Sequence, residues 1–197
     1  MCKICDNTFD FENDIILDCS NCDNIKFLPE SIPNLEYLCI YNTNIENIPK
    51  YDTLKALYAF NSKLKKLPYG LTKLNKLNID NTLVELIPEN YIRLQTLYAN
   101  NTKIKNIPEN LINLQNLEVS NTDIESLSYK FINLDSLVIN NTKIKNIPES
   151  YQYLRYLNIN DTEISKIPNT LSRLNKLYCK NTQIDPFILN SDINIHM

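Results

Sequence analysis

The chain contains almost no glycine. Gly70 is the only one among 197 residues, whereas an average usage of about 7% would give roughly fourteen. The two common phosphate-binding loops both need several glycines, so nucleotide-binding enzymes built on those loops are excluded. Another residue type must supply the turns. The 31 asparagines are suited to this, because asparagine tolerates left-handed backbone angles and its side chain bonds to nearby backbone.

Targeting and spanning segments are also missing. No stretch approaches 18 consecutive apolar residues, and the N-terminal segment is acidic without the apolar core of a signal peptide. The net charge of −3 arises from 20 basic and 23 acidic residues. This charge is too small and too mixed to predict binding to nucleic acid or to an anionic membrane. We therefore expect a cytoplasmic protein with six reduced cysteines that contacts neither nucleic acid nor membrane.

The sequence offers no catalytic constellation. Its single histidine, His196, is the penultimate residue of what reads as a loose tail. A cysteine nucleophile would need a histidine from the body of the fold, and the carboxylates are scattered without a recognisable pair. We predict that the protein is not an enzyme.

An internal repeat dominates the chain. Asn-Thr, or the close variants Asn-Ser and Asp-Thr, recurs every 20 residues from Ser62 to Thr182, after a first step of 19 residues from Thr43. Aligned on this mark, eight units read L-x-x-L-x-[I/A/V/C]-x-N-T-x-I-x-x-I-P. Leucine fills positions 1 and 4 in all eight units, from Leu35 and Leu38 onward. Chance does not keep several apolar columns in register over eight units.

The spacing within the unit predicts its structure. Apolar positions 4 and 6 alternate with polar or aromatic positions 3, 5 and 7, which indicates a strand with one buried face. The chain must then turn and run back, with positions 11, 14 and 18 facing inward. Proline at position 15 in six units prevents a long helix there. Since one unit cannot bury its own apolar face, the units stack into a solenoid, and about nine coils spaced about 4.8 Å apart give a core roughly 40 Å long.

The unit LQNLEVSNTDIESL, residues 114–127, lies on the pattern L-x-x-L-x-L-x-x-N-x-L-x-x-L. Over residues 14–188 the chain resembles the leucine-rich-repeat family, and most of all the short intracellular units of microbial and large-DNA-virus proteins. The resemblance implies an α/β-repeat solenoid of about nine repeats. Its concave face would carry a parallel β-sheet, and its convex side would be irregular or 3-10. We expect an N-terminal cap and divergent first repeat at 1–34, eight repeats at 35–188, and a tail at 189–197.

The chain departs from that pattern in one systematic way. The family's inward asparagine at position 9 is threonine or serine here, and asparagine moves to position 8. A buried hydroxyl can bond the backbone of the turn with fewer contacts than asparagine makes. We interpret the asparagine at position 8 as an exposed turn residue, and both positions as structural.

Four cysteines near the N-terminus suggest a metal site. Cys2, Cys5, Cys19 and Cys22 spell C-x2-C-x13-C-x2-C, and two such pairs can present four thiolates to one tetrahedral zinc ion. That ion would cap the first coil, and four thiolates would leave no open position for catalysis. The alternative is that Cys19 and Cys22 are small apolar residues at inward repeat positions, and that the protein requires no cofactor.

The concave face carries an unusual number of aromatic side chains at positions 3, 5 and 7. They are Tyr37, Tyr41, Tyr58, Phe60 and Tyr98 in the N-terminal half, with Tyr156 and Tyr178 near the end. Tyrosine combines a large contact area with a polar tip and is enriched at protein-recognition hot spots. The alternative is that aromatic residues simply favour strands.

The function that these features favour is a non-enzymatic module that binds an unidentified protein partner on its concave face. The alternative is a zinc-capped adaptor or effector that recruits other machinery, such as ubiquitin ligase components. After Ile184 the chain is too short for a substantial capping helix. Either the last strand, near residues 178–180, is open to edge pairing, which allows a monomer or a weak end-to-end dimer, or Phe187, Ile188 and Leu189 fold back over the last coil.

Overall fold

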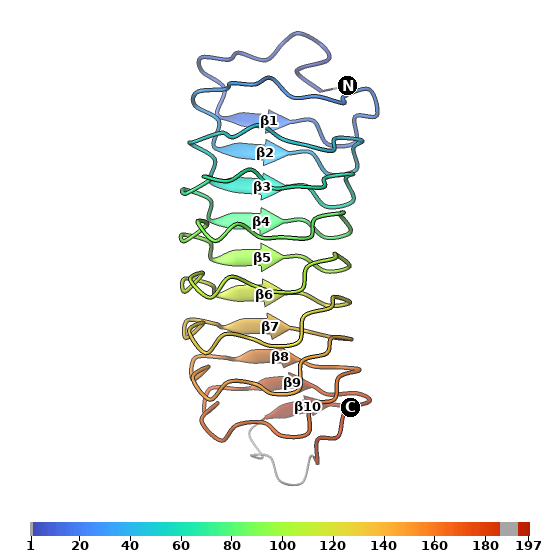
Figure 1. The fold of residues 1–197 in the computed structure, drawn as a ribbon, viewed down its shortest axis with the longest axis vertical. Helices are drawn as coiled ribbons and strands as arrows, with labels where there is room; N and C mark the ends of the chain where they lie inside the picture. Colours follow the sequence, from blue (N-terminus) through green and yellow to red (C-terminus); the bar gives the residue numbers. More distant parts are fainter. Residues whose placement is uncertain (1, 186–192) are drawn as a thin grey trace.

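The computed structural model describes residues 2–185 and 193–197. Within these residues, ten strands form a single sheet in which every strand runs parallel to its neighbours in sequence order (Figure 1). Each strand has three residues: β1 Ile16–Asp18, β2 Tyr37–Cys39, β3 Ala56–Tyr58, β4 Lys76–Asn78, β5 Thr96–Tyr98, β6 Asn116–Glu118, β7 Ser136–Val138, β8 Tyr156–Asn158, β9 Lys176–Tyr178 and β10 Asn194–His196. The predicted repeat solenoid is thus confirmed.

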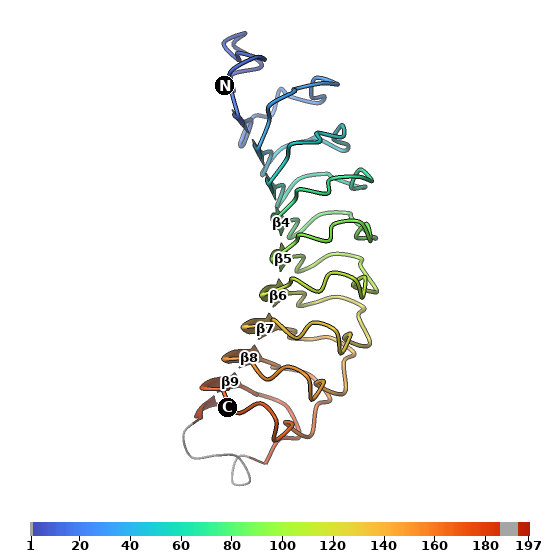
Figure 2. The same ribbon diagram turned by 90° about the vertical axis from the view of Figure 1, so that its left-hand side faces the viewer.

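The strands line one side of the molecule, and the chain returns along the other (Figure 2). The line of strands bows toward the returning segments, so the sheet is the concave face. The parts of the chain that the structure describes contain no helix, and the convex side is therefore made of turns and extended segments. It follows that the same parts contain no helix able to cross a membrane.

The core repeats with the units. The position-4 leucines pair in register from strand to strand, beginning with Leu17 and Leu38, and all of them are buried. Large aromatic residues fill position 18 or its equivalent in four coils: Tyr51, Tyr91, Phe131 and Tyr151. The buried tyrosine hydroxyls each donate to a backbone carbonyl of the previous coil, as Tyr91 does to Pro68 at 2.7 Å. Each of these buried hydroxyl groups thereby has a hydrogen-bond partner inside the core.

Asparagine makes the turn that follows each strand. Every position-8 residue has a positive φ, between 51° and 57°, a conformation that asparagine tolerates better than most residues. Its side-chain amide also donates to the side-chain oxygen one coil earlier, as in Asn61 to Asn42 at 3.0 Å. These bonds form a ladder along one edge of the solenoid. The ladder is interrupted once, where Asp161 has no amide to donate.

The hydroxyl at position 9 closes the same turn. In all eight units it donates to the carbonyl of the position-6 residue, at 2.6–2.8 Å. Seven of these eight threonine or serine residues are buried. The hydroxyl therefore bonds the backbone of the turn, as the sequence predicts.

Both ends of the solenoid carry additional structure. Residues 2–14 lie over the first coil, with Phe9 buried. At the other end β10 pairs with β9. The last residues of the expected tail therefore form a strand. The strand near residues 178–180, which was expected to have an open edge, is paired along that edge. The alternative expectation, that residues 187–189 fold back over the last coil, concerns residues outside those that the structure describes.

Candidate functional site

Four predicted aromatic residues gather on neighbouring strands at the N-terminal end of the concave face. Tyr37 belongs to β2 and Tyr58 to β3, while Tyr41 and Phe60 follow those strands at position 7. The rings of Tyr41 and Phe60 stack with centroids 4.4 Å apart and planes 5° apart. In the register of β2 and β3, Tyr37 lies opposite Ala56 and Tyr58 lies opposite Cys39. Tyr37 is therefore a diagonal neighbour of Tyr58, and the direct ring contact is the one between Tyr41 and Phe60.

Tyr98 is separated from this group. It lies on β5, and Asn78 of β4 occupies the register position between Tyr58 and Tyr98. Burial raises the pKa of Tyr98, and the nearby carboxylates of Glu118 and Asp80 raise it further. The predicted cluster from Tyr37 to Tyr98 is therefore interrupted by one polar strand.

Two isoleucines extend the aromatic group toward the N-terminus. Ile15 and Ile16 expose 44% and 50% of their surface, and Ile16 pairs with Tyr37 in the register of β1 and β2. Sequence reasoning missed them because the first unit diverges from the repeat. Its Ile16 nevertheless occupies position 3, the column that holds Tyr37. We call Ile16, Tyr37, Tyr41, Tyr58 and Phe60 the N-terminal concave patch.

A second aromatic group lies at the opposite end. Tyr156 and Tyr178 are 5.7 Å apart between ring centroids, and His196 of β10 stacks on Tyr178 at 4.3 Å. The Lys176 ammonium group lies 5.8 Å and 5.2 Å from the two tyrosine ring centroids. We call Tyr156, Lys176, Tyr178 and His196 the C-terminal concave patch. It differs from the N-terminal concave patch in carrying a cation.

The surface between the two patches is mostly polar, apart from Tyr98 of β5 and Val138 of β7. At position 7 the Asp80 carboxylate accepts the backbone N–H of Asn100 at 2.6 Å, and the Asn100 side chain accepts that of Ser120 at 2.7 Å. Burial raises the pKa of Asp80, and Glu118 adds to this effect against the opposing hydrogen bond from Asn100. The middle of the concave face thus offers fewer apolar contacts than either end.

The structure brings three of the four N-terminal cysteines together. The sulfurs of Cys2, Cys5 and Cys22 all lie within 4.8 Å of one another. The Sγ–Sγ distances are 3.7 Å from Cys2 to Cys5 and 3.6 Å from Cys5 to Cys22. Cys19 is fully buried next to this group. Burial raises its pKa, and a hydrogen bond with the Cys2 thiol raises that pKa further, but its sulfur is not among those that all lie within 4.8 Å of one another. The three thiols form a group that could hold a metal ion.

The thiols affect one another's protonation. Hydrogen bonds to Cys22 and Cys2 raise the pKa of Cys5 to about 11. Burial by itself would raise the pKa of Cys22, but hydrogen bonds from the backbone amide of Cys2 and from the Cys5 thiol outweigh it and lower that pKa. Cys22 is therefore the member of the group best prepared to carry a negative charge.

Comparison with solved structures identifies the fold. An internalin from Listeria monocytogenes superposes with a TM-score of 0.82 at 20% identity, over 92% of this chain and 60% of that chain. A leucine-rich-repeat protein from Leptospira interrogans gives a TM-score of 0.76 at 17% identity, over the same shares. The chain has the leucine-rich-repeat fold. No protein-family model matches this leucine-rich-repeat sequence, and no curated protein is significantly similar to it.

A third similar structure is a complex. The plant peptide hormone receptor RGFR1, solved in complex with RGF2, gives a TM-score of 0.68 at 21% identity, over 81% of this chain and 31% of the receptor. Identities this low establish the fold alone. This leucine-rich-repeat chain also spans only about 60% of the length of the internalin and of the Leptospira protein.

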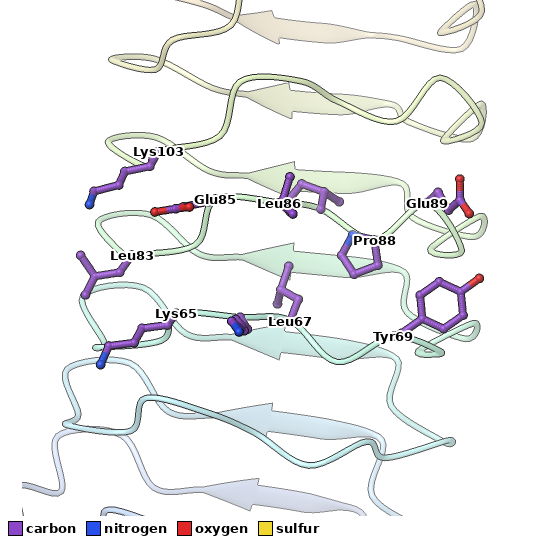
Figure 3. A pocket seen from close by; sticks show the side chains of 11 residues that line it. Lys65, Leu67, Tyr69, Leu83, Glu85, Leu86, Pro88, Glu89 and Lys103 are labelled. Atoms are coloured by element: carbon purple, nitrogen blue, oxygen red, sulfur yellow. The ribbon is translucent and has the colours of Figure 1, made fainter.

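An apolar groove lies on the convex side of this leucine-rich-repeat solenoid. Figure 3 shows Leu67, Leu86 and Pro88 in its middle, with Lys65 and Lys103 toward one end and Tyr69 and Glu89 toward the other. Leu86 is 79% exposed, and position 13 is polar in six of the other seven units. Leu86 thus makes the groove apolar at a position that is polar in most other units.

Proposed function

We propose that this leucine-rich-repeat solenoid is a non-enzymatic interaction module that binds a partner protein through its N-terminal concave patch. The observation that carries the proposal is the patch itself. Ile16 and Tyr37 are exposed and lie opposite one another in register. Farther along the same face the rings of Tyr41 and Phe60 stack, with Tyr58 between the two pairs. Solvent-exposed apolar and aromatic groups gathered on one face are typical of protein-binding surfaces.

The rigidity of the sheet supports this assignment. The aromatic side chains project from strands whose neighbours fix their register, so little conformational freedom is lost when a partner binds. The polar surface around Asp80 and Asn100 borders the patch, and interfaces commonly combine an apolar centre with a polar rim. The plant receptor structure with RGF2 supports the idea that this fold can hold a polypeptide ligand.

The C-terminal concave patch is proposed as a secondary contact. Five strand steps separate Tyr58 on β3 from Tyr156 on β8, which corresponds to about 24 Å along the sheet. An extended segment of about seven residues covers that distance. A partner with an elongated segment would therefore reach both patches, and Lys176 would favour an acidic group at the distal end.

The absence of catalysis is also part of the proposal. On the described concave surface the histidine, His196, stacks on Tyr178 and has no hydrogen-bond partner on Nε2. Its nearest cysteine contact, from the Cys179 thiol, goes to the His196 backbone oxygen. A nucleophile paired with a general base would require a side-chain contact that these residues do not make.

The proposal is tested by affinity capture with two matched double variants. Tyr58→Ala with Phe60→Ala removes the centre of the N-terminal concave patch. Tyr69→Ala with Tyr129→Ala removes two convex tyrosines, each 67% exposed, and serves as the control. We expect a partner that the wild type and the convex variant retain and the concave variant loses. Equal retention by both variants would place the binding surface elsewhere.

A second candidate function rests on the N-terminal cysteines. We propose it because Cys2, Cys5 and Cys22 form a metal-competent group at one end of the solenoid. In this case the expected cap at residues 1–34 is ordered by zinc and recruits other machinery, such as ubiquitin ligase components, while the expected repeats at residues 35–188 bind the target. A second partner that depends on Cys2 and Cys5 but not on Tyr58 and Phe60 would support it. If every captured partner is independent of Cys2 and Cys5, this candidate is wrong.

A further inference from the structure

The three gathered thiols define a specific ligand set. We propose that Cys2, Cys5 and Cys22 bind one Zn²⁺ ion and that Cys19 remains in the hydrophobic core. The second candidate function requires this metal site, whereas binding to the concave face does not. The assignment differs from the sequence pattern, in which all four cysteines are equivalent.

The sulfur spacing matches a tetrahedral metal. A zinc ion with Zn–S bonds of about 2.3 Å places its sulfurs about 3.8 Å apart. The observed separations of 3.7 Å and 3.6 Å are close to that value. A disulfide would need about 2.05 Å between the sulfurs. Cys5 therefore lies at metal-sharing distance from both other thiols, and the third pair, Cys2 and Cys22, lies within 4.8 Å.

The three thiols come from two separate turns. Cys2 and Cys5 belong to the turn that Asp6 closes by donating its backbone N–H to the Cys2 carbonyl at 3.0 Å. Cys22 belongs to the turn after β1, where its backbone N–H donates to the Cys19 carbonyl at 3.2 Å. The gathered sulfurs therefore lie where the N-terminal turn meets the first coil.

Cys19 behaves as a core residue. It occupies position 6 of its unit, where the regular repeats place Ile40 and its equivalents, and it is 0% exposed. Its backbone N–H is fixed by the carbonyl of Cys39 at 2.8 Å. Cys179 occupies the same position at the other end of the solenoid and is likewise buried. Two cysteines in one column with the same burial indicate a packing role for both.

Three protein ligands leave one coordination position for another donor. Cys5 is only partly buried, so the group opens to solvent on its side. Water, or a donor atom from a bound partner, completes the tetrahedron there. This position gives the second candidate function a physical means of linking partner binding to the cap.

The ion would attach the N-terminal segment to the repeats. Apart from the thiols, residues 2–14 contact the rest of the fold through the buried Phe9, the partly buried Ile4 and a hydrogen bond from the Asn34 side chain to the Glu12 carbonyl. The ion pair between Lys3 and Asp14 lies within the segment and does not attach it to the repeats. We therefore expect metal removal to loosen residues 2–14 while the repeats stay folded.

The test is elemental analysis of the full chain, expressed with zinc in the medium and purified without added metal. We expect about one zinc per chain for the wild type and for Cys19→Val and Cys179→Val, and less than about 0.2 for Cys5→Ser and Cys22→Ser. Cys5→Ser is the decisive variant, since Cys5 is partly exposed and its replacement leaves the core intact. Amide hydrogen exchange, measured with and without a chelator, shows separately how metal removal affects residues 2–14 and how it affects the repeats.

Each result decides the proposal. Wild-type protein with less than about 0.2 zinc would overturn the metal site and leave concave-face binding untouched. Zinc lost from Cys19→Val but kept by Cys179→Val would overturn the three-cysteine assignment in favour of four ligands. Chelation that leaves the exchange of residues 2–14 unchanged would contradict the attachment role.

Discussion

The Asn101 side-chain amide donates a hydrogen bond to the Asn81 side-chain oxygen one coil earlier, at 2.8 Å. Asn121 donates to Asn101 in the same way, so each asparagine both donates and accepts. All of them hold the left-handed conformation that the turn needs. One residue type thus supplies the turn and joins neighbouring coils, which explains how the chain forms regular turns with a single glycine.

Replacing Asn101 separates these two roles. Asn101→Ala removes the ladder bonds and places alanine at a φ of 56°, whereas Asn101→Gly removes the bonds without backbone strain. We expect Asn101→Ala to lower the free energy of unfolding by about 1–2 kcal/mol more than Asn101→Gly does. Urea denaturation of the two variants measures the difference, and equal loss would mean that the turn conformation costs nothing there.

The gap in the ladder can be filled. Asp161 accepts the amide of Asn181 at 2.7 Å but cannot donate to Asn141. Asp161→Asn keeps the acceptor and adds the missing donor, and we expect it to stabilise the fold by about 0.5–1 kcal/mol. The matched Asp161→Ala variant should be destabilised. If Asp161→Asn unfolds at a lower urea concentration than the wild type, the ladder does not stabilise the solenoid.

The buried tyrosine hydroxyls are expected to matter individually. Tyr91 donates to the Pro68 carbonyl at 2.7 Å inside the core. Tyr91→Phe leaves that carbonyl without its partner and should lower the free energy of unfolding by about 1–3 kcal/mol. Tyr69→Phe is the control, because Tyr69 lies exposed on the convex side and its change should be neutral. Indistinguishable denaturation midpoints for the two variants would refute the role of the buried hydroxyl.

Asp80 should make stability depend on pH. Its pKa is raised in the folded state, mainly by burial, so its contribution to stability is present in acid and is lost as pH rises through the folded pKa. Asp80→Asn keeps the acceptor for Asn100 and should therefore unfold at higher urea concentration than the wild type at neutral pH, with the difference shrinking toward about pH 3.

Asp123 provides the control for this prediction, because its pKa is shifted in the opposite direction from that of Asp80. Hydrogen bonding to Lys143 lowers the pKa of Asp123, so its contribution is present at neutral pH and is lost in acid. Asp123→Asn should bring no stabilisation at neutral pH. A neutral-pH gain of the same size in both variants would mean that removing negative charge, rather than relieving the burial of Asp80, is responsible.

Much of the fold follows from the sequence because each unit repeats the same physical constraints. The leucines at positions 1 and 4, the proline at position 15 and the hydroxyl at position 9 specify the strand, the return segment and the turn, and the structure places them as expected. The asparagine ladder could not be predicted in the same way. It depends on the side-chain oxygen of one coil lying within reach of the amide in the next, and that distance exists only once the coils have stacked.

The ends were less predictable than the repeats. The β10 segment reads Asn-Ile-His, and without the leucine pattern nothing in it predicts a strand. Ile16 lies in the divergent first unit, so its place beside Tyr37 became evident only from the register of β1 and β2. The cysteine spacing predicts four equivalent ligands, whereas the structure gathers three, because Cys19 follows the inward alternation of the strand.

The most direct test of the central claim is a titration of the purified partner, once captured, against three forms of the chain. The Tyr58→Ala, Phe60→Ala variant should raise the dissociation constant by at least about 30-fold, the effect of losing about 2 kcal/mol at a hot spot. The Tyr69→Ala, Tyr129→Ala variant should bind within about twofold of the wild type. Melting temperatures close to the wild type in both variants ensure that folding is not the cause. Wild-type affinity in the concave variant would contradict the account.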